Sequence, residues 1–288
     1  IQIAWDPKSS QELKGQAFDF LHQLRDDPSG WQICLDLFTR EPQTSEVVRL
    51  VSIEVVNNAI VNLRLDDQSL QFIKDKLLSY CRRVYGTSST QAQLDPASLQ
   101  NKLSQTVTSL FVYCYKQSWT SFIDDFLALT YSATGSTGDN AAGTAMYLRI
   151  LDSIHDEIAD VLTTRTGAEQ KRNNDLKDLV RDRDVQKVAQ SWQDILKQWS
   201  GKEDSLVEKC LRVVGRWVNW VDISLIVNQD FLTILMQLIG RASPSRGEDR
   251  VRDAAVGCLT ETVAKKMKSS DKMDMIEFLN LGDIVSQL

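Results

Sequence analysis

The chain has 288 residues, enough for one or two globular domains or for one elongated repeat array. Its formal net charge of −6 argues against a protein that coats nucleic acid indiscriminately, because such proteins are basic overall. It contains no uninterrupted apolar segment of the roughly 20 residues that cross a bilayer, so we expect no membrane insertion.

Apolar stripes at helical spacing recur in pairs along the chain, and alternating strand patterns are nearly absent. The first members begin near Gln11, Glu46, Ser98, Ala145, Ser205 and Val251, and the second members near Trp31, Ser69, Trp119, Val185, Phe231 and Lys272. This pattern predicts an all-α fold, a right-handed α-solenoid (superhelix) of about six HEAT-type antiparallel helix pairs. We interpret residues 1–288 as a single continuous array.

The segment Ser205–Phe231 predicts two helices joined by a tight corner. An apolar face recurs along the first helix and includes Leu206, Cys210, Val213, Val214, Trp217, Val218 and Val221. Asn228 and Asp230 stand where the second helix begins. We expect Trp217 and Trp220 to pack between neighbouring pairs.

Three segments interrupt the pitch, and a fourth differs from them. Gly86–Pro96, Ser132–Gly143 and Arg241–Glu248 are rich in Gly, Ser, Thr, Gln or Pro and predict loops on the rim of the stack. Thr163–Asp184 is instead highly charged, with few large apolar residues, and predicts a solvated helix on the surface.

No constellation of residues predicts catalysis. His22 and His155 are the only histidines, and neither belongs to a metal-ligand or catalytic pattern. The five cysteines, Cys34, Cys81, Cys114, Cys210 and Cys258, are isolated, which favours buried hydrophobes in a reducing compartment, the cytosol or nucleus. We expect no enzyme activity, cofactor, metal or small-molecule substrate.

Several segments, in order, resemble the exportin-t family, the transfer-RNA export receptors among the importin-β-like karyopherins. The stretch Trp217–Ile226 is similar to that family's W-x-D-x-S-L-I corner. Tyr147–Leu151 resembles an L-Y-L-R-I-L helix, Lys171–Arg181 an R-x-N-x-x-I-K-D-x-M-R run, and Ser191–Leu196 an S-W-x-x-I-L helix. Trp31–Cys34, Phe111-Val112 and Trp119-Thr120 also fall in family order.

The resemblance implies a HEAT-repeat receptor that binds Ran-GTP and mature transfer RNA together and shuttles between nucleus and cytoplasm. It would interact with nuclear pore proteins as it passes through the pore, and it would release both ligands when GTP is hydrolysed. Members are several times longer than this chain, so the resemblance implies an N-terminal fragment.

The resemblance also assigns Ran contact to the inner helices of the first three pairs, about 8–131. Mapped here, these are Trp31–Arg40, Ser69–Tyr85 and Trp119–Thr130. Their outward polar residues are Asp36, Arg40, Lys74, Asp75, Ser79, Arg82, Arg83, Asp124 and Asp125.

An RNA surface requires a strip of Lys and Arg that follows A-form phosphates. We place it in the further repeats, about 141–288. The candidate residues are Lys171, Arg172, Asn173, Asn174, Lys177, Arg181, Arg183 and Lys187, with a second cluster at Lys265, Lys266 and Lys268. Asp178, Asp182 and Asp184 would either aim or neutralise the first group.

Two alternatives stay open from the sequence. One is a related karyopherin with protein or other structured-RNA cargo. The other is a HEAT scaffold without a GTPase partner.

Overall fold

The computed structural model describes residues 1–63, 65–86, 94–132, 138–241 and 249–279. Within these ranges the regular structure is helical, and no strand occurs. The chain divides into two compact units, Ile1–Ala133 and Thr134–Leu288, and the division falls between the third and fourth predicted pairs. The predicted continuity of the array across this division stays a prediction.

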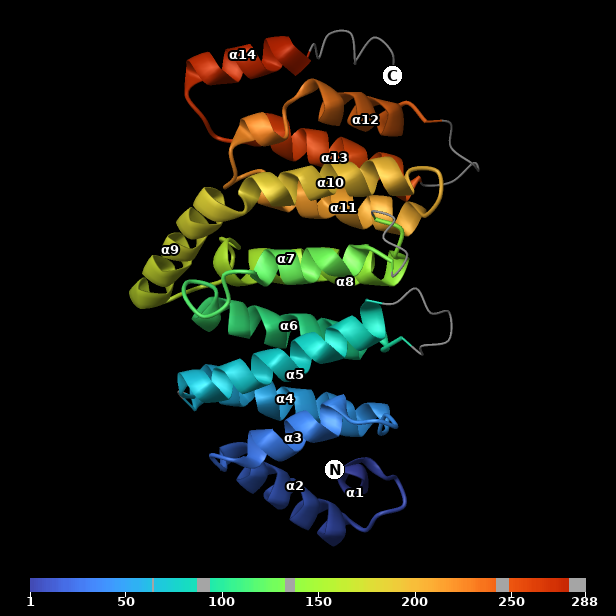
Figure 1. The fold of residues 1–288 in the computed structure, drawn as a ribbon, viewed down its shortest axis with the longest axis vertical. Coiled ribbons are helices and arrows are strands. Elements are labelled where there is room, and N and C mark those ends of the chain that lie inside the picture. Colours follow the sequence, from blue (N-terminus) through green and yellow to red (C-terminus); the bar gives the residue numbers. More distant parts are fainter. Residues whose placement is uncertain (64, 87–93, 133–137, 242–248, 280–288) are drawn as a thin grey trace. The chain divides into compact units, whose positions relative to one another are not determined.

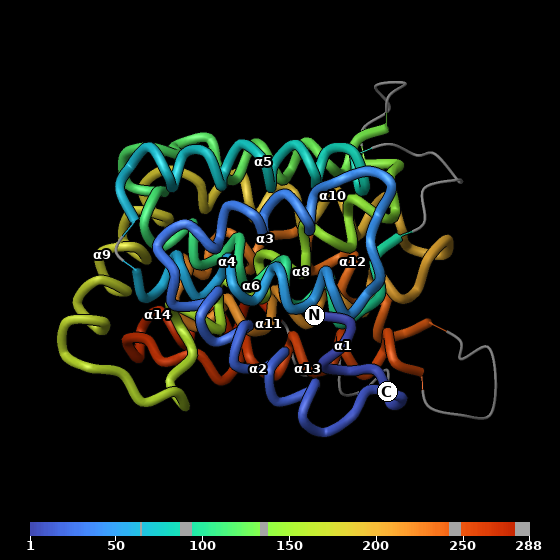
Figure 2. The backbone as a smooth tube through the Cα atoms, turned by 90° about the horizontal axis from the view of Figure 1, so that it is seen from below, coloured from blue at the N-terminus to red at the C-terminus, as the bar shows by residue number. Residues whose placement is uncertain are grey.

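Unit 1 is a stack of helix pairs (Figure 1). Its elements are α1 (Gln2–Trp5), α2 (Gln11–Asp26), α3 (Gly30–Thr39), α4 (Glu46–Asn62), α5 (Asp67–Tyr85), α6 (Ala97–Cys114), α7 (Phe122–Leu127) and the 3-10 turn η1 (Ala128–Thr130). Helix α4 packs against α3 and α6, while α5 contacts α3, α6 and η1. Seen from below, α5 lies along one side of the unit, and α4 and α6 lie together between it and α2 (Figure 2).

Unit 2 repeats this two-layered arrangement with one additional helix. Its elements are α8 (Ala141–Ile158), α9 (Gly167–Arg183), α10 (Val185–Trp199), α11 (Asp204–Trp217), the 3-10 turn η2 (Ile223–Leu225), α12 (Gln229–Ile239), α13 (Arg250–Ala264) and α14 (Ser269–Leu279). Helix α11 packs between α8 and α13, and α10 contacts α12. The additional helix, α9, runs obliquely to α8 and α10 and contacts both (Figure 1).

Polar side chains at the helix starts explain where the helices begin. Asp66 accepts a hydrogen bond from the Ser69 amide at 2.7 Å, and Asn228 accepts one from the Phe231 amide at 3.0 Å. Such caps satisfy amides that have no partner within the helix. The carboxylate of Asp249 accepts hydrogen bonds from the Val251 and Arg252 amides in the first turn of α13 in the same way.

A buried polar cluster joins three elements of unit 1. Asp95, just before α6, accepts hydrogen bonds from Arg49 of α4 at 2.7 Å and from the Tyr80 hydroxyl of α5 at 2.8 Å. The Tyr85 hydroxyl donates to the same carboxylate at 2.6 Å. Burial, followed by the charge of Asp95, raises the pKa of Tyr80 and Tyr85 and keeps both phenols protonated as donors. The cluster therefore ties the start of α6 to α4 and α5.

The structure confirms the all-α solenoid of helix pairs, the corner and the surface helix. Trp217 is fully buried and meets Trp192 of α10 edge-to-face, with ring centroids 5.6 Å apart. All five cysteines are free and buried. Residues 87–93, 133–137 and 242–248 of the predicted loops lie outside the described residues.

The predicted third inner helix, Trp119–Thr130, is wrong in extent. Its α-helical part is only Phe122–Leu127. Trp119 lies before it, because the Trp119 indole N–H and the Ser121 hydroxyl both donate to the Asp125 carboxylate at 2.8 Å and fold the segment into turns. That competition between side chain and backbone delays the helix start.

Candidate interaction surfaces

Ion pairs join the helices that carry the candidate Ran residues. Asp36 of α3 pairs with Lys76 of α5 at 3.1 Å, and Arg82 of α5 pairs with Asp125 of α7 at 2.7 Å. A third pair links Arg83 of α5 to Glu41, which follows α3, at 2.8 Å. We call these three pairs the α5 ladder. Since the ladder joins α3, α5 and α7, those three helices present one connected charged surface.

The remaining candidates of unit 1 lie in differing environments. Arg40, Asp75, Ser79 and Asp124 are exposed. Lys74 is largely covered and sits over the ring of Trp119, 5.4 Å from its centroid. Asp125 is also mostly covered, because it accepts hydrogen bonds from Arg82, Trp119 and Ser121. Lys74 and Asp125 therefore support the segment around Trp119 and are largely inaccessible to a partner.

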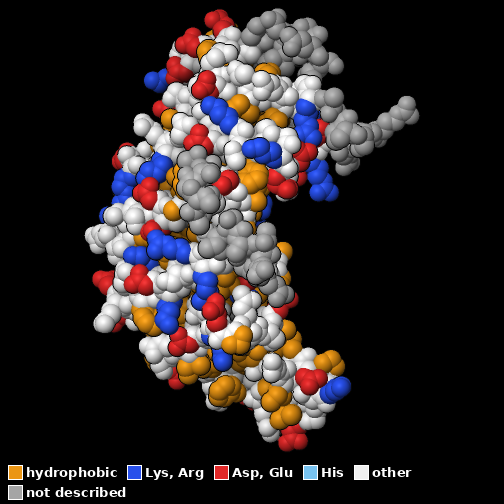
Figure 3. Space-filling model, turned by 45° about the vertical axis from the view of Figure 1, so that its right-hand side comes forward, with side chains coloured by type: hydrophobic (Ala, Val, Ile, Leu, Met, Phe, Trp, Pro, Cys, Tyr) orange, Lys and Arg blue, Asp and Glu red, His pale blue; other side chains and the backbone are white. Residues whose placement is uncertain are grey.

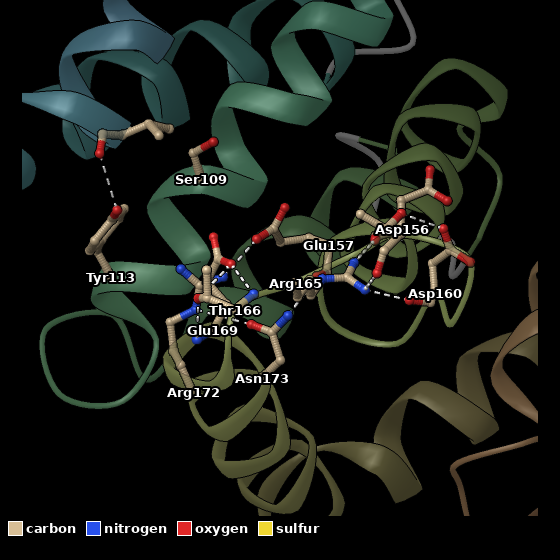
Figure 4. Close-up of polar contacts among 12 residues, drawn as sticks. Ser109, Tyr113, Asp156, Glu157, Asp160, Arg165, Thr166, Glu169, Arg172 and Asn173 are labelled. Carbon is tan, nitrogen blue, oxygen red and sulfur yellow. Dashed lines mark hydrogen bonds and ion pairs between the residues drawn. The ribbon is translucent and has the colours of Figure 1, made fainter.

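Two clamps fix the orientation of α9. At its first turns, Arg172 pairs with Glu157 of α8 at 2.9 Å, and the Asn173 amide donates to the Glu157 carbonyl at 2.9 Å (Figure 4). Near its last turn, Arg181 donates to the Trp220 carbonyl at 2.6 Å and lies over the Trp220 ring. Buried Leu176 and Val180 supply the apolar contact between the clamps.

The loop before α9 is held by its own side chains. Arg165 donates to the carbonyl oxygen of Asp156, in the last turn of α8, at 2.6 Å, and to that of Asp160, which follows α8 (Figure 4). A positive group there complements the exposed carbonyls of a helix C-terminus. Thr166 and Glu169 form a reciprocal capping box that starts α9.

Several candidate RNA residues are therefore structural. Asn173 is buried with its amide committed to α8, so its assignment as an RNA donor is wrong. Arg172 and Arg181 hold α9, and Lys187 pairs with Asp184 at 3.2 Å. Arg183 is half-buried at the end of α9. Of the candidate RNA residues on α9, exposed Lys171 and Asn174 and half-buried Lys177 remain.

Lys265 also serves the fold rather than a free surface. Its ammonium donates to the carbonyls of Val218 at 2.7 Å and Val221 at 3.0 Å, just beyond α11. Burial, then the positive charge of Arg181, lowers the pKa of Lys265. Lys266 and Lys268 are exposed. Only these two of the three lysines lie where phosphates could reach them.

Charges of both signs are interleaved on the face drawn in Figure 3. The same holds along α9, where Lys171, Arg172, Lys177, Arg181 and Arg183 alternate with the carboxylates of Glu169, Asp175, Asp178 and Asp182. Arg172 pairs with Glu157 and Arg181 pairs with Asp178, so the other cations of α9 are Lys171, Lys177 and half-buried Arg183.

Three residues that build these surfaces have no recognisable signature in the sequence. Lys76 and Glu41 complete the α5 ladder, and Arg165 closes the loop before α9. Lys76 pairs with a residue 40 positions away, and Glu41 with one 42 positions away. Arg165 binds backbone carbonyls, which have no side-chain signature. Spacing within one helix therefore could not reveal these contacts.

A family model described as Exportin 1-like protein matches residues 96–259, which is more than half of the chain. The chain belongs to this family. The matched region begins at the start of α6 and ends within α13, so it includes the third pair of unit 1, the α8–α9 clamps and the tryptophan corner.

Individual relatives are similar over the entire chain. It is 55% identical over 288 residues to Exportin-T of Podospora anserina and 57% identical over 288 residues to Exportin-T of Chaetomium globosum. It is 54% identical over 292 aligned residues to Exportin-T of Aspergillus oryzae. All of this chain is covered, but it spans only about 28% of the length of these relatives. The resemblance to exportin-t predicted from the motifs is confirmed.

No helix within the described ranges combines the length and apolarity that a membrane span requires.

Proposed function

We propose that this chain is part of a nuclear export receptor for transfer RNA that binds Ran-GTP and RNA together. The observation that carries the proposal is the similarity to Exportin-T over the entire chain, at 53–57% identity. The receptor shuttles between nucleus and cytoplasm, meets nuclear pore proteins on the way, and releases its ligands when Ran hydrolyses GTP. It acts by binding, and its chemistry is that of recognition rather than catalysis.

The α5 ladder is the proposed Ran surface. Ion pairs at 2.7–3.1 Å between α3, α5 and α7 hold exposed Arg40, Asp75, Ser79 and Asp124 on one set of adjacent helices. A partner of mixed charge can exchange these weak surface pairs for its own at little cost, since an exposed pair contributes only about 0–1 kcal/mol. The ladder then sets orientation and specificity.

The proposed RNA surface consists of Lys171, Asn174, Lys177, Lys266 and Lys268. Arg172 and Arg181 position it, because both fix the orientation of α9. A rigid helix presents its ammonium groups at constant spacing, which suits the regular phosphates of A-form RNA. Because this surface has few cations, we expect this chain to supply only part of the RNA affinity of the full-length receptor.

Titration of transfer RNA into the full-length receptor, with Ran-GTP, Ran-GDP or no Ran, tests the function. We expect Ran-GTP, but not Ran-GDP, to raise the RNA affinity, because both ligands select one conformation of the receptor. Transfer RNA should then raise the affinity for Ran-GTP by the same factor. Binding of Ran-GTP without transfer RNA would instead indicate a karyopherin with another cargo. Binding of neither ligand would indicate a HEAT scaffold.

A further inference from the structure

A polar groove of about 520 Å³ is lined mainly by residues of α8, α11 and α13 in unit 2. Its lining includes buried Gly215 and Ala254 and exposed Gly257, where no side chain covers the backbone of α13. Charged side chains of all three helices form its walls. The proposed Ran and RNA surfaces make no use of it.

Both arginines of the groove are already neutralised. Arg216 of α11 pairs with Asp152 and Asp156 of α8, and Arg212 pairs with Glu208 at 3.0 Å. His155 adds no charge at neutral pH, because burial, followed by the charge of Arg216, lowers its pKa to about 4. Both arginines of the groove therefore already have counter-charges within this chain.

Two carboxylates of α13 remain. Asp253 and Glu261 line the groove and are exposed, and neither forms an ion pair with any residue that the structure describes. They are eight residues apart, so they stand about 12 Å apart along the helix. Gly257 lies between them and leaves the space open.

We propose that this groove binds an extended basic segment of a protein partner, with two Arg or Lys side chains four residues apart. Four residues of extended chain span about 13 Å, which matches the separation of the two carboxylates. Exposed Gly257 leaves room for the peptide backbone between the two carboxylates. RNA does not suit the groove, because its phosphates would face the carboxylates.

The test uses the full-length protein and fluorescein-labelled eight-residue Gly/Ser peptides. One peptide carries arginine at its second and sixth positions, one carries two adjacent arginines, and one carries glutamate at the second and sixth positions. We expect the spaced-arginine peptide to bind most tightly and the glutamate peptide not to bind. Equal affinity for the two arginine peptides would contradict the spacing argument, and no binding of either would overturn the proposal.

Two independent variants locate the binding. Asp253→Asn with Glu261→Gln should weaken the spaced-arginine peptide about tenfold, as two exposed ion pairs would. Gly257→Leu should abolish binding by filling the groove. It should leave the fold intact, because a Cβ at Gly257 would meet nothing within 4 Å. The matched control is Asp274→Asn with Glu277→Gln, which removes two exposed carboxylates from α14.

Transfer-RNA affinity and thermal melting are measured on the same variants. The proposal predicts no change in either. If the groove variants bind the peptide as the control does, the peptide site lies elsewhere. If they lose RNA instead of peptide, the groove belongs to the cargo. Because the peptide assay needs neither Ran nor RNA, its outcome is independent of the proposed export function.

Discussion

Trp217 of α11 donates its indole N–H to the carbonyl oxygen of Leu151 in α8 at a distance of 3.0 Å. The same ring meets Trp192 of α10 edge-to-face and lies 4.5 Å, centroid to centroid, from the ring of Trp220. One side chain thus joins three helices of unit 2. A tryptophan corner recognised from its sequence motif is, physically, the point where two neighbouring pairs are locked together.

Replacing Trp217 with Ala should destabilise the protein by roughly 3–5 kcal/mol, because a fully buried indole is replaced by a cavity. Trp217→Phe should cost less but leave the Leu151 carbonyl without its donor. Thermal or denaturant melts measure both. Trp5→Ala, at an exposed tryptophan of α1, is the control, and a Trp217→Ala melt equal to that of the parent would sink the claim.

Replacing Asp95 with Ala should cost about 3–5 kcal/mol, because it leaves the guanidinium of Arg49 buried without a counter-charge. The double variant Arg49→Met with Asp95→Ala should recover part of the loss. Asp36→Ala breaks an exposed pair and should cost no more than about 1 kcal/mol. If Asp95→Ala and Asp36→Ala unfold at the same denaturant concentration, the cluster does not anchor α6.

His155 should make stability depend on pH. Its pKa is lowered to about 4 in the folded state, whereas an unfolded His titrates near 6.5. Below about pH 6.5 the unfolded chain therefore binds a proton that the folded chain does not, and stability falls as the pH drops to about 4. The loss is up to about 3 kcal/mol.

His155→Gln should remove this dependence, as judged by denaturant melts between pH 4 and 7. Trp220 donates to the His155 Nδ1 at 3.4 Å, and Gln retains an acceptor there. The control is His22→Gln, at an exposed position of α2. A parent and a His155→Gln variant with identical pH profiles would contradict the prediction.

Lys171→Gln with Lys177→Gln should weaken RNA binding by the full-length receptor and reduce its salt dependence by up to about two phosphate contacts. Arg172→Gln with Arg181→Gln should act mainly through the loss of the α9 clamps, lowering the melting temperature as well as the RNA affinity. The salt slope separates the two effects. If only the arginine double variant reduced the salt dependence of RNA binding, the arginines rather than the lysines would be the phosphate contacts.

Arg40→Glu should weaken Ran-GTP binding about tenfold without changing the melting temperature, because Arg40 is exposed at the end of α3. Lys116→Glu changes charge equally at another exposed site of unit 1 and should have no effect. Surface plasmon resonance with immobilised Ran-GTP measures both. Equal affinities for the two variants would move the Ran surface away from α3.

The amino-acid sequence by itself determined the helical fold, the order of the pairs and the family. Helical spacing of apolar residues and caps such as Asp66 and Asn228 act within a few positions, so they are legible in one dimension. The motif at Trp217–Ile226 is equally local. The high charge of Thr163–Asp184 predicted the surface helix α9.

Only the tertiary structure decided which polar residues are available to partners. Three residues of the kind expected on an RNA surface instead donate hydrogen bonds to backbone carbonyls of other segments: Asn173, Arg181 and Lys265. Helix α7 is shortened by side-chain bonds to Asp125 in the same manner. Lys265, for example, binds the Val221 carbonyl, 44 residues away. Every residue has such a carbonyl, so the sequence does not distinguish a lysine that binds one from a lysine that faces water.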